Sequence, residues 1–412
     1  MNSIQKYHVY IHIPFCIRRC PYCYFMAKYQ NDKYVFDPKY LEKYTCALCN
    51  DIENTHFPVG DITSVVFGGG TPSLLSKKQF VEIMNTLRKK AGTQLRACES
   101  YAYEMSPSTM NKSMLNCLNE HGFNRISIGI QSFIDDELKL LGRQYAGDCA
   151  IDACRRILAL DYDCVNIDLL IGFPGQSTSS LLSSLRTAID LKPQHISINL
   201  FYKSYPGGDG YIESCAAKGK ILPSLSKKIL LYKKANDELA SSGYEQLDNT
   251  VYTQKGYKFD YEKEAVGEAV PVLSFGPGSA GYWNNAMRYT PPEIESYLDV
   301  PKARTEELSI DKHAFATVWG QLNVYHVIKD DLTLKMFGMT LSDMRMLNAD
   351  IDTLLGRLVD ADMAVDDGSS VGLKNDKVVD AIVLMHHIRD NWGYRLVTAP
   401  RNIEEEERGS IQ

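Results

Sequence analysis

Residues 7–23 read YHVYIHIPFCIRRCPYC, a β-branched and aromatic run followed at once by three closely spaced cysteines. The run Tyr7–Ile13 predicts a strand, because such residues favour extended backbone. Cys16, Cys20 and Cys23 follow in a CxxxCxxC loop. Thiolates are the usual protein ligands of iron–sulfur clusters, and three of them leave one iron of a [4Fe–4S] cube open to a small molecule. Structural zinc is the alternative, but it needs four ligands and no clear fourth one lies nearby.

From Tyr7 onward, β-rich runs alternate with segments of helical period at a spacing of about 25–35 residues, which is typical of βαβ units and a parallel sheet. The expected strands are Tyr7–Ile13, Ser64–Phe67, Ser100–Met105, Arg125–Ile128, Val165–Ile171 and His195–Phe201. The expected helices between them are Pro38–Ile52, Lys77–Lys89, Asn111–Glu120, Asp148–Ala159 and Ser179–Asp190. The pattern predicts a partial or full (β/α) barrel, with a flat doubly wound sheet as the alternative.

Polar or glycine-rich groups follow five of these strands, at the carboxyl ends where parallel α/β folds place their chemistry. The groups are the cysteine loop, Gly68–Pro72, Glu104, Gln131 and Asp168. We therefore expect them to face one site.

The pattern changes after about residue 225, and three segments are expected. Residues 1–225 form the barrel core, 226–305 supply barrel-closing strands and an accessory segment, and 306–412 form a mainly helical, winged-helix-like module. In the last segment, Val371–Leu373 is expected to form a wing.

Composition narrows the function classes. The 412 residues carry a net charge of −6, which implies no broad basic face and argues against a nucleic-acid partner. No apolar run approaches the ~18 residues of a membrane span, and the first ten residues lack a signal-peptide core. A cytoplasmic protein with reduced thiols is expected. The cysteines outside the motif are expected to be small buried hydrophobes, including Cys46 and Cys49 on one helix face.

The motif of residues 10–23 resembles the radical S-adenosylmethionine (SAM) superfamily, and within it the group of oxygen-independent coproporphyrinogen III oxidase, over residues 7–282. Further matching motifs begin at Gly68, Glu104, Ile128, Leu141 and Asn166. The resemblance implies a [4Fe–4S] cluster on the three cysteines and SAM contacts from Gly69, Gly70, Thr71, Glu104, Gln131, Arg143 and Asp168. It also implies Tyr10 and Tyr22 beside the cofactors, and a second SAM molecule near Gly276 and Gly278.

The resemblance implies reductive cleavage of SAM to a 5′-deoxyadenosyl radical, with an electron donor such as flavodoxin or ferredoxin and a small-molecule substrate. Three segments resemble radical SAM methyltransferases: Ile198–Phe201, Gly243–Leu247 and Gly276–Gly281. They favour methyl or methylene transfer to an unsaturated carbon of a tetrapyrrole or an aromatic substrate.

Two alternatives remain open. Oxidative decarboxylation of coproporphyrinogen III is one, although only fifteen residues precede Cys16, whereas the oxidase has a long extension there. Heme binding and trafficking is the other, although residues 258–262 lack the histidine motif of the family's heme chaperones. Candidate axial ligands for a heme are His121, His195, His313, His386 and His387.

Overall fold

The structure is a computed structural model, and it describes residues 6–23, 38–203, 208–257, 261, 263–268, 270–283, 286–291, 293–299, 304–307 and 309–392. Its centre is a nine-stranded sheet in the order β7-β8-β6-β5-β4-β3-β2-β1-β9. The parallel strands β1 to β6 span Lys6–Ile13, Asp61–Gly69, Ser100–Met105, Arg125–Gln131, Cys164–Ile171 and His195–Leu200. All six expected strands of the first half are therefore present.

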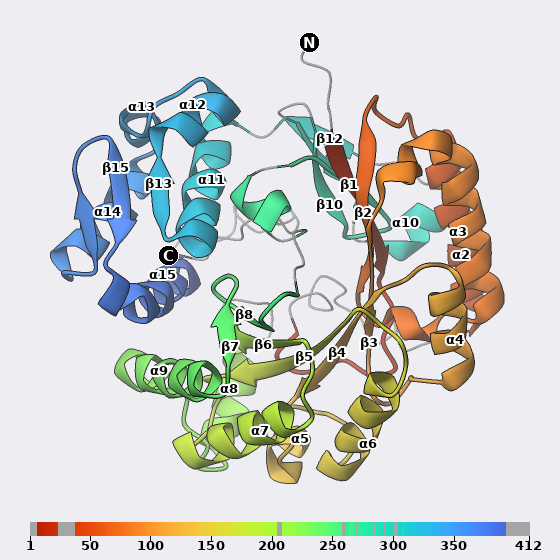
Figure 1. The fold of residues 1–412 in the computed structure, drawn as a ribbon, viewed down its shortest axis with the longest axis horizontal. Coiled ribbons are helices and arrows are strands. Elements are labelled where there is room, and N and C mark those ends of the chain that lie inside the picture. The colour runs from red at the N-terminus through yellow and green to blue at the C-terminus, as the bar shows by residue number, and fades with distance from the viewer. Residues whose placement is uncertain are drawn as a thin grey trace, which may run out of the picture.

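Consecutive strands are neighbours in this sheet, so each connection crosses back over the same face. Right-handed crossovers all in one direction curl a sheet, and the helices cover its convex side. Figure 1 shows this arrangement, with helices outside a curved sheet. The covering helices are α2 Pro38–Asn54, α3 Lys77–Ala91, α4 Lys112–Glu120, α6 Gly147–Leu158, α7 Thr178–Asp190 and α9 Leu225–Ser241. The predicted partial (β/α) barrel is confirmed, and the flat doubly wound sheet is not observed.

The sheet is open rather than closed among the described residues. One edge is formed by β8 (Val251–Gln254), which pairs antiparallel with β6, and by β7 (Tyr244–Gln246) beyond it. The other edge is β9 (Val272–Phe275), which pairs parallel with β1. No pairing joins the two edges, so the structure is a partial barrel.

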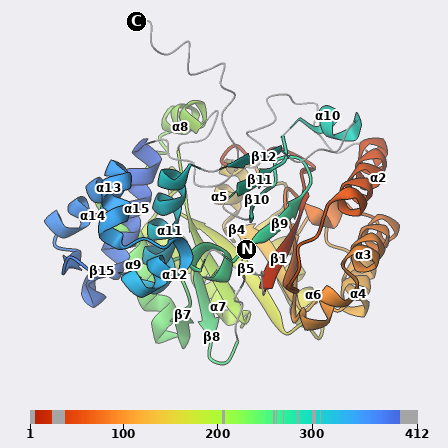
Figure 2. The ribbon, with the colours of Figure 1, turned by 90° about the horizontal axis from the view of Figure 1, so that it is seen from above.

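Several elements escaped sequence analysis because they are short and lack a clear period. They are α5 Asp135–Leu140, α8 Gly208–Ala216, α10 Ile294–Asp299 and an antiparallel sheet of β10 Ala280–Trp283, β11 Ala286–Tyr289 and β12 Arg304–Glu307. Figure 2 shows α2 and α3 on one side of the molecule and the helices of residues 310–360 on the other.

The C-terminal residues build a second hydrophobic core of their own, around Phe315, Leu354 and Met385. Its helices are α11 Ile310–Tyr325, α12 Asp330–Phe337, α13 Leu341–Leu347, α14 Ala349–Asp360 and α15 Val378–Trp392. Its strands are β13 Val327–Lys329, β14 Ala364–Asp366 and β15 Ser370–Leu373, in the order β13-β15-β14. Strand β15 contains the expected wing residues Val371–Leu373.

This C-terminal module meets the preceding part of the chain through α15, which packs against α9, and through α11, which packs against the short helical turn Lys263–Gly267. Lys233 on α9 and Asp380 on α15 form an ion pair of 2.6 Å, and Val383 of α15 belongs to the core of the barrel. The module therefore lies beside the β6–β8 edge of the sheet rather than at a distance from it.

Two cysteine predictions are wrong. Cys49 is buried as expected, but Cys46 and Cys149 are exposed. Cys46 lies three residues before Cys49, yet the apolar stripe of α2 does not reach it, so its side chain meets solvent.

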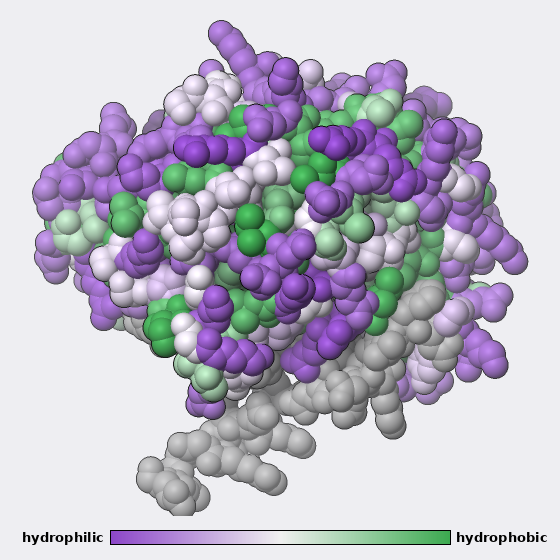
Figure 3. Space-filling model, turned by 90° about the horizontal axis from the view of Figure 1, so that it is seen from below, coloured by the Kyte–Doolittle hydropathy of each residue, from purple (hydrophilic) through white to green (hydrophobic). Residues whose placement is uncertain are grey.

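No helix in the described part of the chain is both long and apolar enough to cross a bilayer. On the face drawn in Figure 3, hydrophobic residues are interspersed among hydrophilic ones.

The capping box of α3 gives a test of local stability. Ser76 Oγ accepts a hydrogen bond from the backbone N–H of Gln79 at 3.3 Å, and Gln79 Oε1 accepts one from the N–H of Ser76 at 2.9 Å. Ser76→Ala is expected to lower the free energy of unfolding by about 1 kcal/mol, measured by urea denaturation. The exposed Lys78→Ala in the same turn is the control, and equal stability of the two variants would contradict the capping role.

Candidate cofactor and substrate site

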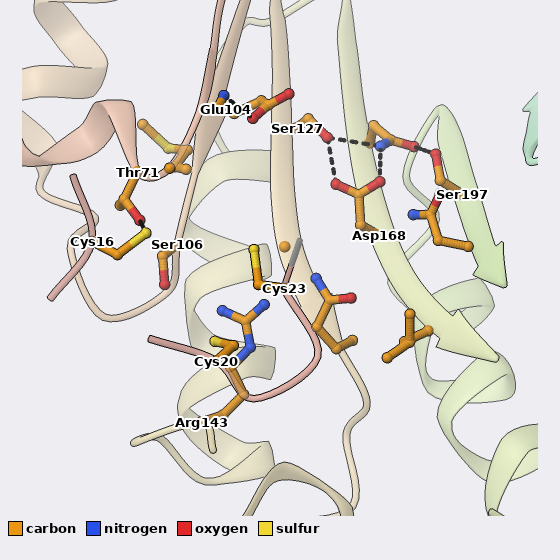
Figure 4. Close-up of a pocket in the computed structure, with 18 of the residues that line it drawn as sticks. Cys16, Cys20, Cys23, Thr71, Glu104, Ser106, Ser127, Arg143, Asp168 and Ser197 are labelled. Carbon is orange, nitrogen blue, oxygen red and sulfur yellow. Dashed lines mark hydrogen bonds between the residues drawn. The ribbon is translucent and has the colours of Figure 1, made fainter. Parts of the chain in front are cut away.

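A cavity of about 590 Å³ opens where the carboxyl ends of the parallel strands meet. Its wall includes the cysteine loop after β1, the glycines at the end of β2 and polar side chains of β3 to β6. Figure 4 shows these side chains converging from separate strands. The structure brings twelve predicted residues to this one wall: Tyr10, Cys16, Cys20, Tyr22, Cys23, Gly69, Gly70, Thr71, Glu104, Gln131, Arg143 and Asp168.

The three cysteines share the wall, but their sulfurs are not gathered around one point. Among the described residues, no three His, Cys, Asp or Glu side chains lie close enough together to form a finished metal site. Thr71 Oγ1 donates a hydrogen bond to Cys16 Sγ at 3.2 Å. Burial, reinforced by the neighbouring Cys23, raises the pKa of Cys16 to about 12. Such a thiol stays protonated at neutral pH, whereas a bound metal replaces the proton outright.

The cysteine loop packs directly on the glycine edge of β2. The N–H of Gly70 donates to the carbonyl of Ile13 at 2.8 Å. A Cβ on Gly70 would lie 2.6 Å from the carbonyl oxygen of Phe15, and one on Gly69, at φ +104°, would lie 2.5 Å from the His12 ring. Glycine permits this approach, because a side chain at residue 70 would collide with backbone and one at residue 69 with the His12 ring.

Arg143 faces the cysteine loop from the segment after α5. Its guanidinium carbon lies 5.8 Å from the centre of the Tyr22 ring and 6.0 Å from that of Tyr145. Its Nε is buried without a hydrogen-bond partner among the described residues. A buried donor without a partner is costly, so this position suits a ligand that brings a carboxylate. Together, three thiols beside an orphaned cationic donor fit a cluster with an amino acid on its open iron.

Asp168 is held by a network across three strands. Its carboxylate accepts from Ser127 Oγ at 2.7 Å and from Asn166 Nδ2 at 2.9 Å. Asn166 Oδ1 in turn accepts from Ser197 Oγ at 2.9 Å. Burial raises the pKa of Asp168, and the hydrogen bonds oppose that shift. The network locks the carboxylate in one orientation, as recognition of a ligand hydroxyl pair requires.

Glu104 lies next to the glycine edge and accepts a hydrogen bond from the N–H of Gly69 at 3.1 Å. Its side chain lies on the cavity wall and is exposed there. Burial and the nearby Asp168 raise the pKa of Glu104 to about 7. Near neutral pH a cationic ligand would therefore shift this carboxyl group to its ionised form.

Gln131 adopts a φ of 72° at the end of β4, where the register with β5 shifts between Gly129 and Gln131. Left-handed backbone is uncommon for glutamine, and a bulge of this kind re-aims a side chain. Here it turns Gln131 to the cavity wall.

Sequence analysis missed three polar residues deep in the cavity, Arg125, Ser127 and Ser197. A signal for them was present in the sequence. In β4, β5 and β6, polar residues recur at alternate positions, and alternate positions of a strand share one face of the sheet. In strands flanked by helices such residues are unexpected, because both faces of the sheet are usually apolar.

Other predicted residues lie elsewhere. Gly276 and Gly278 do not line the cavity, and a Cβ on Gly276 would lie 2.6 Å from the carbonyl oxygen of His12. Packing alone accounts for that glycine, so the second SAM site stays a prediction. None of the described lining residues is a histidine. Of the segment at residues 258–262, all but Tyr261 lie outside the described residues.

Comparison with known proteins identifies the class to which this site belongs. Residues 10–188 match the model of the radical SAM superfamily. The chain therefore contains a radical SAM domain, and proteins of this superfamily use a [4Fe–4S] cluster and SAM.

The particular relatives are of two kinds. The heme chaperone HemW of Bacillus subtilis (strain 168) is 27% identical over 296 residues, 71% of this chain and 75% of that protein. The HemW of Escherichia coli (strain K12) is 30% identical over 267 residues, 63% of this chain and 65% of that protein. Coproporphyrinogen III oxidase (HemN) from Escherichia coli has the same fold, with a TM-score of 0.72 at 20% identity over 93% of this chain and 90% of its own.

The raised pKa of Glu104 predicts a pH-dependent affinity for SAM. Below about pH 7 the carboxyl is protonated and cannot pair with a cationic amino group. The Kd for SAM is expected to fall roughly tenfold between pH 6 and pH 8, since each pH unit below the pKa costs a factor of ten. Anaerobic calorimetry on the cluster-loaded protein measures it.

Glu104→Gln is expected to bind SAM more weakly and without this pH dependence. The exposed Glu99→Gln, just before the same strand, is the control and should titrate like the unmodified protein. An unchanged pH profile in Glu104→Gln would remove Glu104 from the SAM site.

Proposed function

We propose that this chain is a radical SAM protein that binds a [4Fe–4S] cluster, SAM and a tetrapyrrole in one cavity, and that its primary task is to bind heme. The observation that carries the proposal is the single cavity on which the cysteine loop, the glycine edge and the carboxylates of β3 and β5 converge. A volume of about 590 Å³ lies in the range of small-molecule sites.

In this proposal each wall segment has a distinct role. Cys16, Cys20 and Cys23 ligate the cluster, which supplies the electron for cleavage of SAM. The glycine edge (Gly69, Gly70 and Thr71) and Glu104 hold the amino end of SAM, and Arg143 pairs with its carboxylate. Gln131 and Asp168 hold the ribose, with Asp168 oriented by Ser127 and Asn166. Tyr10 and Tyr22 close the cavity beside the cofactors.

A tetrapyrrole is the ligand class that the two kinds of relative have in common. The sequence relatives are named heme chaperones, and the oxidase that shares the fold is named for a porphyrinogen. The chaperone names favour heme binding over methyl transfer. The cavity wall also includes Asn199, Tyr202 and Thr250, which are not among the proposed SAM contacts and are available to a second ligand.

Radical chemistry on the bound ligand is the second candidate. The observation that favours it is the Ser127–Asn166–Asp168–Ser197 network, which would hold the ribose of SAM in one orientation, as cleavage of SAM beside a bound ligand requires. Methyl transfer and oxidative decarboxylation are its possible outcomes. Either would draw electrons from a donor such as flavodoxin or ferredoxin.

Anaerobic reconstitution tests the cofactor assignment. The protein supplied with iron and sulfide is expected to hold about four irons per chain and, with dithionite and SAM, to release 5′-deoxyadenosine. Cys20→Ala should lose both properties, because the loop then has two ligands. Cys149→Ala, which removes an exposed cysteine outside the motif, is the control. Zinc in place of iron, or equal iron content in both variants, would contradict the assignment.

A heme titration separates the two candidate functions. Heme binding predicts one heme per chain, recovered chemically unchanged after incubation with SAM and reductant. Methyl transfer predicts S-adenosylhomocysteine together with 5′-deoxyadenosine and a modified tetrapyrrole, and decarboxylation predicts loss of a carboxyl group from a porphyrinogen. Absence of any heme binding would reject the primary proposal.

A further inference from the structure

A heme held in this cavity needs an axial ligand for its iron, and this inference rests on the proposed heme binding. None of the described residues that line the cavity is a histidine. Tyrosine also ligates heme iron through its phenolate oxygen. The cavity wall contains several tyrosines, so the environment of each decides which of them suits that role.

Tyr202, directly after β6, lies where the barrel wall meets the C-terminal module. It is partly exposed and lines the cavity, and its hydroxyl is hydrogen-bonded to Nδ1 of His386 from α15. The two ring centroids are 5.4 Å apart. Trp319 of α11 packs edge-on against His386 at 5.4 Å. His386 is only 6% exposed, so its ring is held in place.

The direction of the Tyr202–His386 hydrogen bond follows from a series of linked hydrogen bonds that starts at a backbone carbonyl, which can only accept. The carbonyl of Trp319 can only accept, so the atom of Asn323 that lies 2.7 Å from it is the Nδ2 donor. Asn323 Oδ1 therefore faces Asn249 and accepts from its Nδ2 at 2.7 Å. The same Nδ2 donates its other hydrogen to Nε2 of His386 at 2.9 Å. In the neutral ring one nitrogen accepts and the other donates, so the proton of His386 is on Nδ1.

The imidazole N–H therefore points at the phenol oxygen of Tyr202. A hydrogen bond donated to an oxygen favours its ionised form, and partners behind a metal ligand fix its orientation and tune its affinity. We propose that the phenolate oxygen of Tyr202 is the axial ligand of ferric heme, and that His386 is the residue that positions it. An Fe–O bond forms, the phenol proton passes to solvent, and the iron remains ferric.

Two further cavity tyrosines lie against a histidine, Tyr261 against His8 and Tyr10 against His12. Tyr10 Oη lies 3.2 Å from His12 Nδ1. A Cβ on Gly68 would meet both Tyr10 Oη, at 3.0 Å, and the Glu104 carboxyl, at 2.9 Å. Tyr10 thus faces a carboxylate at the glycine edge, where a phenolate would be repelled. Tyr202 instead faces an N–H donor.

The proposal also assigns a function to the C-terminal module. Asn323, Trp319 and His386 belong to α11 and α15, so the module supplies the support of an iron ligand that the barrel carries. Heme binding at Tyr202 would then be felt by the module through the Tyr202–His386 hydrogen bond, beside the bonds from Asn249 to Asn323 and His386.

The test is titration of the cluster-loaded, full-length protein with ferric heme under anaerobic conditions, followed by difference absorption, electron paramagnetic resonance and resonance Raman spectra. The unmodified protein is expected to show a high-spin ferric heme with phenolate–iron vibrations. Tyr202→Phe should lose those vibrations. His386→Gln should keep them but bind heme about tenfold more weakly, the usual effect of removing the partner behind a metal ligand.

Tyr211→Phe is the matched control, because Tyr211 packs near Phe201 but does not line the cavity. Iron content and circular dichroism of each variant establish that it is folded. If the unmodified protein binds no heme, the proposed function fails. If it binds heme and Tyr202→Phe keeps the phenolate signature, or Tyr10→Phe removes it, the proposed function stands and the assignment of Tyr202 is overturned.

Discussion

The close backbone contact between the cysteine loop and the glycine edge of β2 is the constraint on which the site depends. Parallel pairing of β1 with β2 runs to Ile13 and Gly69, and the N–H of Gly70 continues it to the carbonyl of Ile13. At that point no side chain fits between the two segments. The loop that carries three cysteines is thereby held at the carboxyl end of the sheet, facing the carboxylates of β3 and β5.

The curl of the sheet converts one row of strand ends into a cavity with polar walls. Strands covered by helices on one face would ordinarily be apolar on both, but here the inward positions of β3 to β6 carry Glu104, Arg125, Ser127, Asp168 and Ser197. Burying such groups is costly unless they are hydrogen-bonded. The hydrogen bonds to Asp168 meet that condition. Arg143 Nε is buried without a hydrogen-bond partner among the described residues, and a bound ligand could accept a hydrogen bond from it.

The C-terminal module has its own hydrophobic core, yet it is more than an appendage to the barrel. Its helix α15 packs on α9, and His386 reaches a tyrosine in the cavity wall. Because the module touches the wall just after β6, away from the cysteine loop, it is placed to influence the proposed tetrapyrrole rather than the proposed cluster.

The sequence by itself determined the alternation of strands and helices, the parallel sheet, the cysteine loop and twelve of the residues that reach the cavity. These features are local: period, turn chemistry and motif spacing are read along the chain. The inward polar residues Arg125, Ser127 and Ser197, the exposed position of Cys46 and the pairing of Tyr202 with His386 were decided only by the tertiary structure. They depend on which face a strand or helix buries and on contacts between residues as many as 184 positions apart, and no pattern along the chain contains that information.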